Sequence, residues 1–113
     1  MRGIMFTNGS LEIEGLTGKE SIKKQLEVIQ QYFKEKHIEV TTLNTNQIYK
    51  HYTILHALLF DLEKNKAHLD CFVTYSNCAT ERFKSLYPEK WEQLVNHFTH
   101  IIELDSWIRG SKM

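Results

Sequence analysis

The stretch LDCFVTY, residues 69–75, decides the fold of this chain. It is rich in aromatic and β-branched side chains and has polar segments on both sides, which favours a β-strand. Its apolar residues hardly alternate with polar ones, so both faces of the strand are expected to be buried. Such a strand lies inside a sheet with helices on either side, and helical patterns do flank it in the sequence.

Strand and helix patterns alternate along the rest of the chain. Further strands are expected at residues 3–7, 38–43 and 101–104. Helices are expected at residues 19–36, 53–64, 80–86 and 88–100. The resulting β-α-β-α-β-α-β order predicts an α/β fold, a three-layer α/β/α sandwich with a mainly parallel sheet of about four strands.

Helix ends and stripes add detail to this prediction. Either Ser21, or Thr17 with Glu20 three residues later, is expected to begin the first helix. Thr53 is expected to cap the second helix. The buried stripe of the last helix is expected to comprise Trp91, Leu94, Val95 and Phe98, with Trp107 packing at an edge of the fold.

Composition limits the classes of function. The 113 residues suffice for one hydrophobic core, so residues 1–113 are expected to form a single domain. Fourteen basic and fourteen acidic residues cancel, which argues against a surface built wholly for nucleic acid. No apolar run is long enough to span a bilayer and no signal peptide is evident, so a cytoplasmic protein without membrane contact is expected. Cys71 and Cys78, seven apart, fit neither a disulfide framework nor a metal site.

One order of residues carries a family resemblance. Ser10 is followed eleven positions later by SIKKQLEVI, residues 21–29, then by Tyr32 and by IEV, residues 38–40. This order resembles the start of the catalytic domain of the serine recombinases, the resolvases and invertases. That family opens with a strand ending in Arg-Val-Ser, an acidic loop and a Ser-Ile-x-x-Gln helix. The likeness covers about residues 3–105 and implies a resolvase-like, flavodoxin-like fold.

The resemblance places Ser10 at the family's nucleophile, which attacks a DNA phosphodiester within a tetramer. Family arginines stabilise the charge that gathers on the phosphoryl oxygens. Here Asn8 and Ala79 stand at two arginine positions, none matches near residues 52–53, and Arg82 alone keeps its charge. One lost oxyanion donor typically costs about 2.7–4 kcal/mol of transition-state stabilisation. The chain is therefore expected not to be an enzyme, and Ser10 to be an inactive relic.

Three functions stay open from the sequence. The first is a catalytically inactive resolvase-like domain, linked to DNA recombination by resemblance, that forms a homodimer or binds a protein partner. The second is a small serine recombinase with residual DNA binding or phosphoryl transfer through Ser10 and Arg82. The third is small-molecule binding at the carboxyl edge of the sheet, although the chain lacks a Gly-rich phosphate loop. The 113 residues hold no counterpart of the family's separate DNA-binding domain.

Several of these residues also have purely structural interpretations. Residues 8–10 alone are typical of a turn after a strand. Ser21 and Gln25 are expected to cap and decorate a helix, and Arg82 to be a solvated side chain. His97 and His100 have a helical metal-ligand spacing but no evident third ligand, so neither a metal nor a cofactor is expected.

Overall fold

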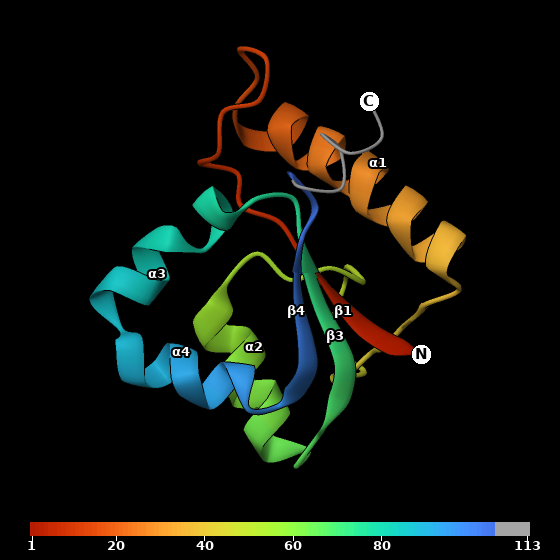
Figure 1. The fold of residues 1–113 in the computed structure, drawn as a ribbon, viewed down its shortest axis with the longest axis vertical. Coiled ribbons are helices and arrows are strands. Elements are labelled where there is room, and N and C mark those ends of the chain that lie inside the picture. The colour runs from red at the N-terminus through yellow and green to blue at the C-terminus, as the bar shows by residue number, and fades with distance from the viewer. Residues whose placement is uncertain (106–113) are drawn as a thin grey trace.

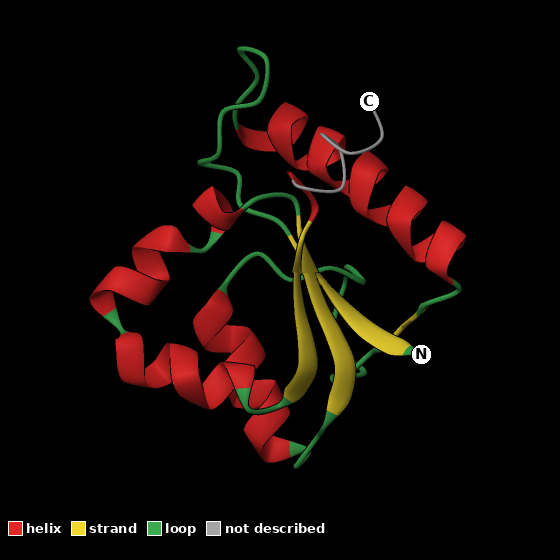
Figure 2. Cartoon of the chain, viewed as in Figure 1, coloured by secondary structure: helices red, strands yellow, loops and turns green. Residues whose placement is uncertain are grey.

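The computed structural model describes residues 1–105, which form a parallel sheet with helices on both faces (Figures 1 and 2). The strands are β1 (Arg2–Phe6), β2 (Glu39–Val40), β3 (Leu69–Thr74) and β4 (Phe98–Glu103). The helices are α1 (Gly18–Lys36), α2 (Leu55–Lys64), the short 3₁₀ turn η1 (Asn77–Ala79), α3 (Glu81–Leu86) and α4 (Pro88–Val95). The predicted α/β fold class is confirmed.

The sheet has the strand order β2-β1-β3-β4, and every pairing in it is parallel. The stretch at 69–75 provides the interior strand β3, which pairs with β1 on one side and β4 on the other. Phe72 packs into one hydrophobic cluster while Cys71 and Val73 pack into a second, and all three are fully buried. A strand buried on both faces explains why its sequence does not alternate.

Two cores lie on opposite faces of the sheet. On one face, Ile29 and Phe33 of α1 pack against Met5 and Val73. On the other face, residues of α2 and α4 such as Leu58 pack around Phe72. Figure 1 shows α1 on one side of the sheet and α2, α3 and α4 on the other. The chain therefore leaves the neighbouring strands β1 and β3 toward opposite faces, which makes their carboxyl ends a topological switch point.

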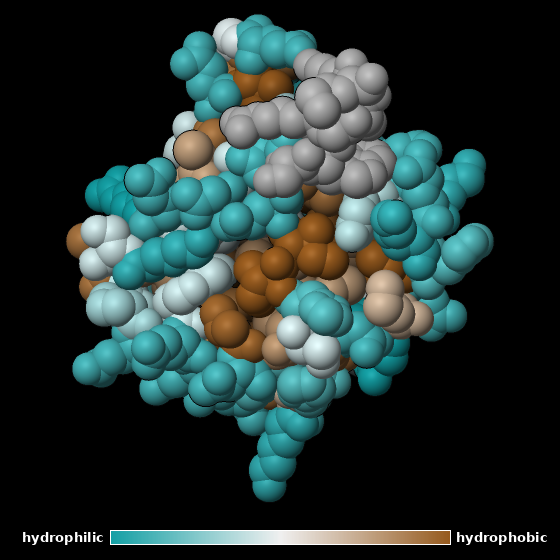
Figure 3. Space-filling model, in the orientation of Figure 1, coloured by the Kyte–Doolittle hydropathy of each residue, from teal (hydrophilic) through white to brown (hydrophobic). Residues whose placement is uncertain are grey.

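The sheet ends with β4, which has no strand on its outer side among residues 1–105. Ile101 and Ile102 of this strand are only half-buried. Figure 3 shows a hydrophobic area in the middle of the face over β4. No helix in the described part of the chain is both long and apolar enough to cross a membrane.

The sequence mislocated some element boundaries. The last helix ends at Val95 instead of His100, and Phe98 belongs to β4, where it pairs with Leu69. Backbone pairing with β3 outweighs the helical spacing of the apolar residues at this point. The expected strand at 38–43 shrinks to the two residues of β2. Ile54 instead of Thr53 occupies the N-cap of α2. The packing expected of Trp107 falls outside the described residues.

Candidate functional site

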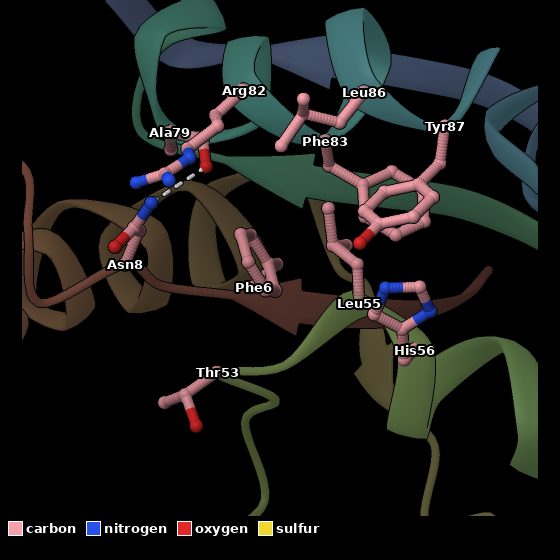
Figure 4. A pocket seen from close by; sticks show the side chains of 10 residues that line it. All are labelled: Phe6, Asn8, Thr53, Leu55, His56, Ala79, Arg82, Phe83, Leu86 and Tyr87. Atoms are coloured by element: carbon pink, nitrogen blue, oxygen red, sulfur yellow. Dashed lines mark hydrogen bonds between the residues drawn. The ribbon is translucent and has the colours of Figure 1, made fainter.

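The site lies where β1 and β3 end at the carboxyl edge of the sheet. Residues 8–10 follow β1, and η1 with α3 follows β3. The sequence-predicted residues Ser10 and Arg82 therefore come from segments that meet at one edge. Asn8 and Arg82 both line a cavity of about 380 Å³ at this edge (Figure 4).

Asn8 joins the two segments. Its side-chain Nδ2 donates a hydrogen bond to the Ala79 carbonyl at 3.0 Å, and its Oδ1 accepts one from the Ser10 backbone N–H at 2.9 Å. Together these bonds fix which end of the amide is nitrogen and which is oxygen. Asn8 thus joins the loop after β1 to the loop after β3.

Gln25 anchors Asn8 from the other side. Its Oε1 accepts a hydrogen bond from the Asn8 backbone N–H at 3.0 Å. Its Nε2 donates to the Asn8 carbonyl at 2.8 Å and to the Ser21 hydroxyl at 2.9 Å. The Ser21 hydroxyl donates in turn to the Leu11 carbonyl. The loop after β1 is therefore held by buried polar side chains of α1.

The expected roles of Ser21 and Gln25 as cap and decoration of α1 are wrong. Both side chains are fully buried, and Thr17 occupies the N-cap without a side-chain cap bond. The sequence contained a signal for this burial, because Ser21 and Gln25 precede the core residues Ile29 and Phe33 at a constant spacing of four. Polar residues that continue a buried stripe need internal hydrogen-bond partners, and the loop after β1 supplies them.

Ser10 is exposed in the turn after β1. Its backbone N–H bonds to Asn8, and its hydroxyl has no hydrogen-bond partner within residues 1–105. The chain has three arginines, Arg2, Arg82 and Arg109. Arg2 begins β1 and so lies at the opposite edge of the sheet, while Arg109 falls outside the described residues. Arg82 is therefore the arginine that the described structure places at the Ser10 edge.

The cavity has a polar end and an aromatic wall. Figure 4 shows the Arg82 guanidinium beside Asn8 at one end, with His56, Phe83 and Tyr87 at the other. The His56 ring meets Tyr87 edge-on at a centroid distance of 4.7 Å and Phe83 at 5.0 Å. Among residues 1–105, no aspartate or glutamate lines the cavity. The Arg82 guanidinium forms no ion pair or hydrogen bond with another described residue.

Other titratable groups of the core serve packing. Burial, then the charge of Asp70, raises the pKa of the Cys71 thiol to about 11. Burial, then the hydrogen bond to Asp61, raises the pKa of Tyr52 above its ordinary value. The Tyr52 hydroxyl donates to Asp61 Oδ2 at 2.6 Å. This pair pins the segment before α2 to the helix.

His97 and His100 do not lie on one helix, so they lack the metal-ligand spacing that the sequence suggested. His97 follows the end of α4, and His100 lies within β4. A ring nitrogen of His97 lies 2.7 Å from the Ala67 carbonyl. Within residues 1–105, no three histidine, cysteine, aspartate or glutamate side chains gather as a metal site would require.

Comparisons of the chain with protein-family models, curated proteins and solved structures found no match. The likeness to the serine recombinases therefore rests on the residues quoted from the sequence.

Proposed function

We propose that this chain is a catalytically inactive resolvase-like domain that acts as a dimerisation module. One observation carries the proposal. Among residues 1–105, Arg82 is the one arginine at the edge of the sheet where Ser10 lies. The position two residues before Ser10 holds Asn8, whose amide is committed to the Ala79 carbonyl and the Ser10 N–H.

The chemistry of phosphoryl transfer explains why the small number of arginines near Ser10 matters. Its transition state spreads negative charge over non-bridging oxygens, and catalysis depends on cations already aimed at them. Lys84, another cation of α3, is engaged with Glu103 at 3.2 Å and with Asn77 at 2.8 Å. The neutral Asn8 side chain and one exposed guanidinium do not supply the several positive charges that the family's reaction uses.

The association half of the proposal is supported by β4. An edge strand presents unpaired backbone N–H and C=O groups, and half-buried Ile101 and Ile102 add apolar surface beside them. Two copies of one strand can pair across a twofold axis, because the same surface serves both partners. The proposed partner is therefore a second copy of this chain, joined through β4.

Light scattering across a concentration series tests the association. The wild-type chain is expected to have the molar mass of a dimer. Thr99→Lys, an exposed change on β4, and Ile102→Lys are expected to shift it toward monomer while the circular dichroism spectrum stays unchanged. Ile48→Lys, at a side chain 89% exposed outside the sheet, is the matched control and should remain dimeric. A wild-type monomer at every concentration would refute the proposal.

A residual recombinase is the second candidate, and the exposed Ser10 hydroxyl with Arg82 at the same edge favours it. Gel electrophoresis with supercoiled DNA separates the two functions. The proposal predicts neither a salt-sensitive shift nor a detergent-resistant adduct. An adduct that Ser10→Ala abolishes would replace the proposed function with this candidate.

A further inference from the structure

We infer that the cavity between β1, α2 and α3 binds a small planar aromatic molecule that carries one anionic group, a phosphate or a carboxylate. This inference is independent of the proposed dimerisation, because β4 does not line the cavity. It assigns a ligand to the edge of the sheet without invoking any reaction at Ser10.

The location is the first argument. Open parallel sheets bind ligands in the crevice outside the carboxyl ends of the strands, where neighbouring connections leave toward opposite faces. In this chain that point lies between β1 and β3. The cavity begins at Phe6, the last residue of β1, and continues to Ala79 and Arg82 after β3. Its volume of about 380 Å³ falls within the range of small-molecule sites.

The polar end of the cavity suits an anion. Arg82 lines it with a guanidinium that no described carboxylate neutralises, and no acidic residue of the described part of the chain lines the cavity. Asn8 Nδ2 uses one of its two N–H donors on the Ala79 carbonyl, which leaves the second without a partner in residues 1–105. A phosphate or carboxylate accepts hydrogen bonds from both groups, and the charged donor makes the stronger one.

The opposite end suits an aromatic ring. His56, Phe83 and Tyr87 form a cluster of mutually tilted rings, with the Phe83 and Tyr87 centroids 5.5 Å apart. Leu86, 58% exposed, and Tyr87, 42% exposed, leave apolar surface open at this rim. A flat ring packed there gains both apolar burial and edge-to-face contact, while its anionic substituent reaches Arg82.

Phenyl phosphate is the simplest probe of both ends. Titration followed by amide chemical shifts should show saturable binding with Kd in the range of about 1 mM, with the largest shifts at Asn8, Ala79 and Arg82. Benzoate tests whether a carboxylate replaces the phosphate. Inorganic phosphate and benzyl alcohol, each of which offers only one half of the probe, should bind at least about tenfold more weakly.

Two variants locate the binding. Arg82→Gln removes the exposed charge and should weaken phenyl phosphate by about tenfold, the loss of one charge-assisted hydrogen bond. His56→Ala removes an exposed ring from the wall and should weaken it by a smaller factor. Arg2→Gln is the matched control, since this arginine lies at the opposite edge, and its affinity should equal that of wild type.

Three results would overturn the inference. The first is that neither phenyl phosphate nor benzoate binds at a concentration about ten times the expected Kd. The second is that the Arg82→Gln variant binds phenyl phosphate as tightly as the Arg2→Gln variant does. Inorganic phosphate binding as tightly as phenyl phosphate would also overturn it, because the aromatic wall would then contribute nothing.

Discussion

Gln25→Leu tests whether a buried side chain of α1 holds the loop that carries Ser10. Leucine nearly matches glutamine in size but offers no polar atoms. The substitution removes three hydrogen bonds, two to the Asn8 backbone and one to Ser21. It leaves the Asn8 backbone N–H without its partner, whereas the Asn8 carbonyl still accepts a hydrogen bond from the Leu11 N–H at 3.1 Å. Each unsatisfied buried group costs about 1–3 kcal/mol, and leucine recovers part of that through apolar packing. The expected loss in free energy of unfolding is about 1–3 kcal/mol.

Urea unfolding followed by circular dichroism measures this loss. The matched control is Gln31→Leu on the same helix, where the exposed side chain makes one hydrogen bond to Glu35 at 3.0 Å. Its effect should stay within about 0.5 kcal/mol, as is usual for surface substitutions. The reasoning fails if the free energy of unfolding of Gln25→Leu lies within about 1 kcal/mol of the wild-type value, or if both variants lose the same amount.

Three further predictions concern the central strands. The Thr74 hydroxyl is buried without a partner in the described structure, whereas the Thr80 hydroxyl donates to the Asn77 carbonyl. In urea unfolding, Thr74→Val should be neutral or stabilising by up to about 1 kcal/mol and Thr80→Val destabilising; a large loss at Thr74 would reveal a hydrogen bond there. Gly3→Ala should cost about 1–3 kcal/mol, because the added Cβ would lie 2.8 Å from Cys71 Sγ; a stability equal to wild type would show that the strands separate freely. Folding raises the pKa of the Cys71 thiol from 9.0 to about 11, so the thiol ionises at a lower pH in the unfolded chain than in the folded one. The contribution of this group to the free energy of unfolding is therefore complete below pH 9 and is lost as the pH rises toward 11. A Cys71→Ala variant should show a shallower alkaline loss, and an unchanged slope would contradict the assignment.

The sequence was informative where burial alone sets the pattern. The weakly alternating, mostly apolar stretch at 69–75 identified β3 as an interior strand, and the stripe of α1 identified a helix packed on one face. Both follow from the exclusion of apolar side chains from water, which leaves a period in the sequence. The prediction failed at Phe98, where an apolar residue fits a helical stripe and a strand equally well. Its pairing with Leu69, 29 positions away, is a long-range contact that local spacing does not encode.

The candidate site was only partly visible in the sequence. The family resemblance singled out Ser10 and Arg82, and the strands that precede them end at the same edge of the sheet. The hydrogen bonds of Asn8 and the burial of Gln25 were missed, because a glutamine on a helix is usually solvated. The aromatic wall was missed as well, since His56 on α2 and Tyr87 after α3 are brought together by the tertiary fold, which local spacing does not encode.

The central claim is that the edge at Ser10 has lost the positive charges that strand transfer requires. The mass of the peptide containing Ser10, measured after incubation with supercoiled DNA and nuclease digestion, tests it most directly. The account predicts an unmodified peptide. A peptide carrying a 5′-nucleotide on the Ser10 oxygen would contradict it.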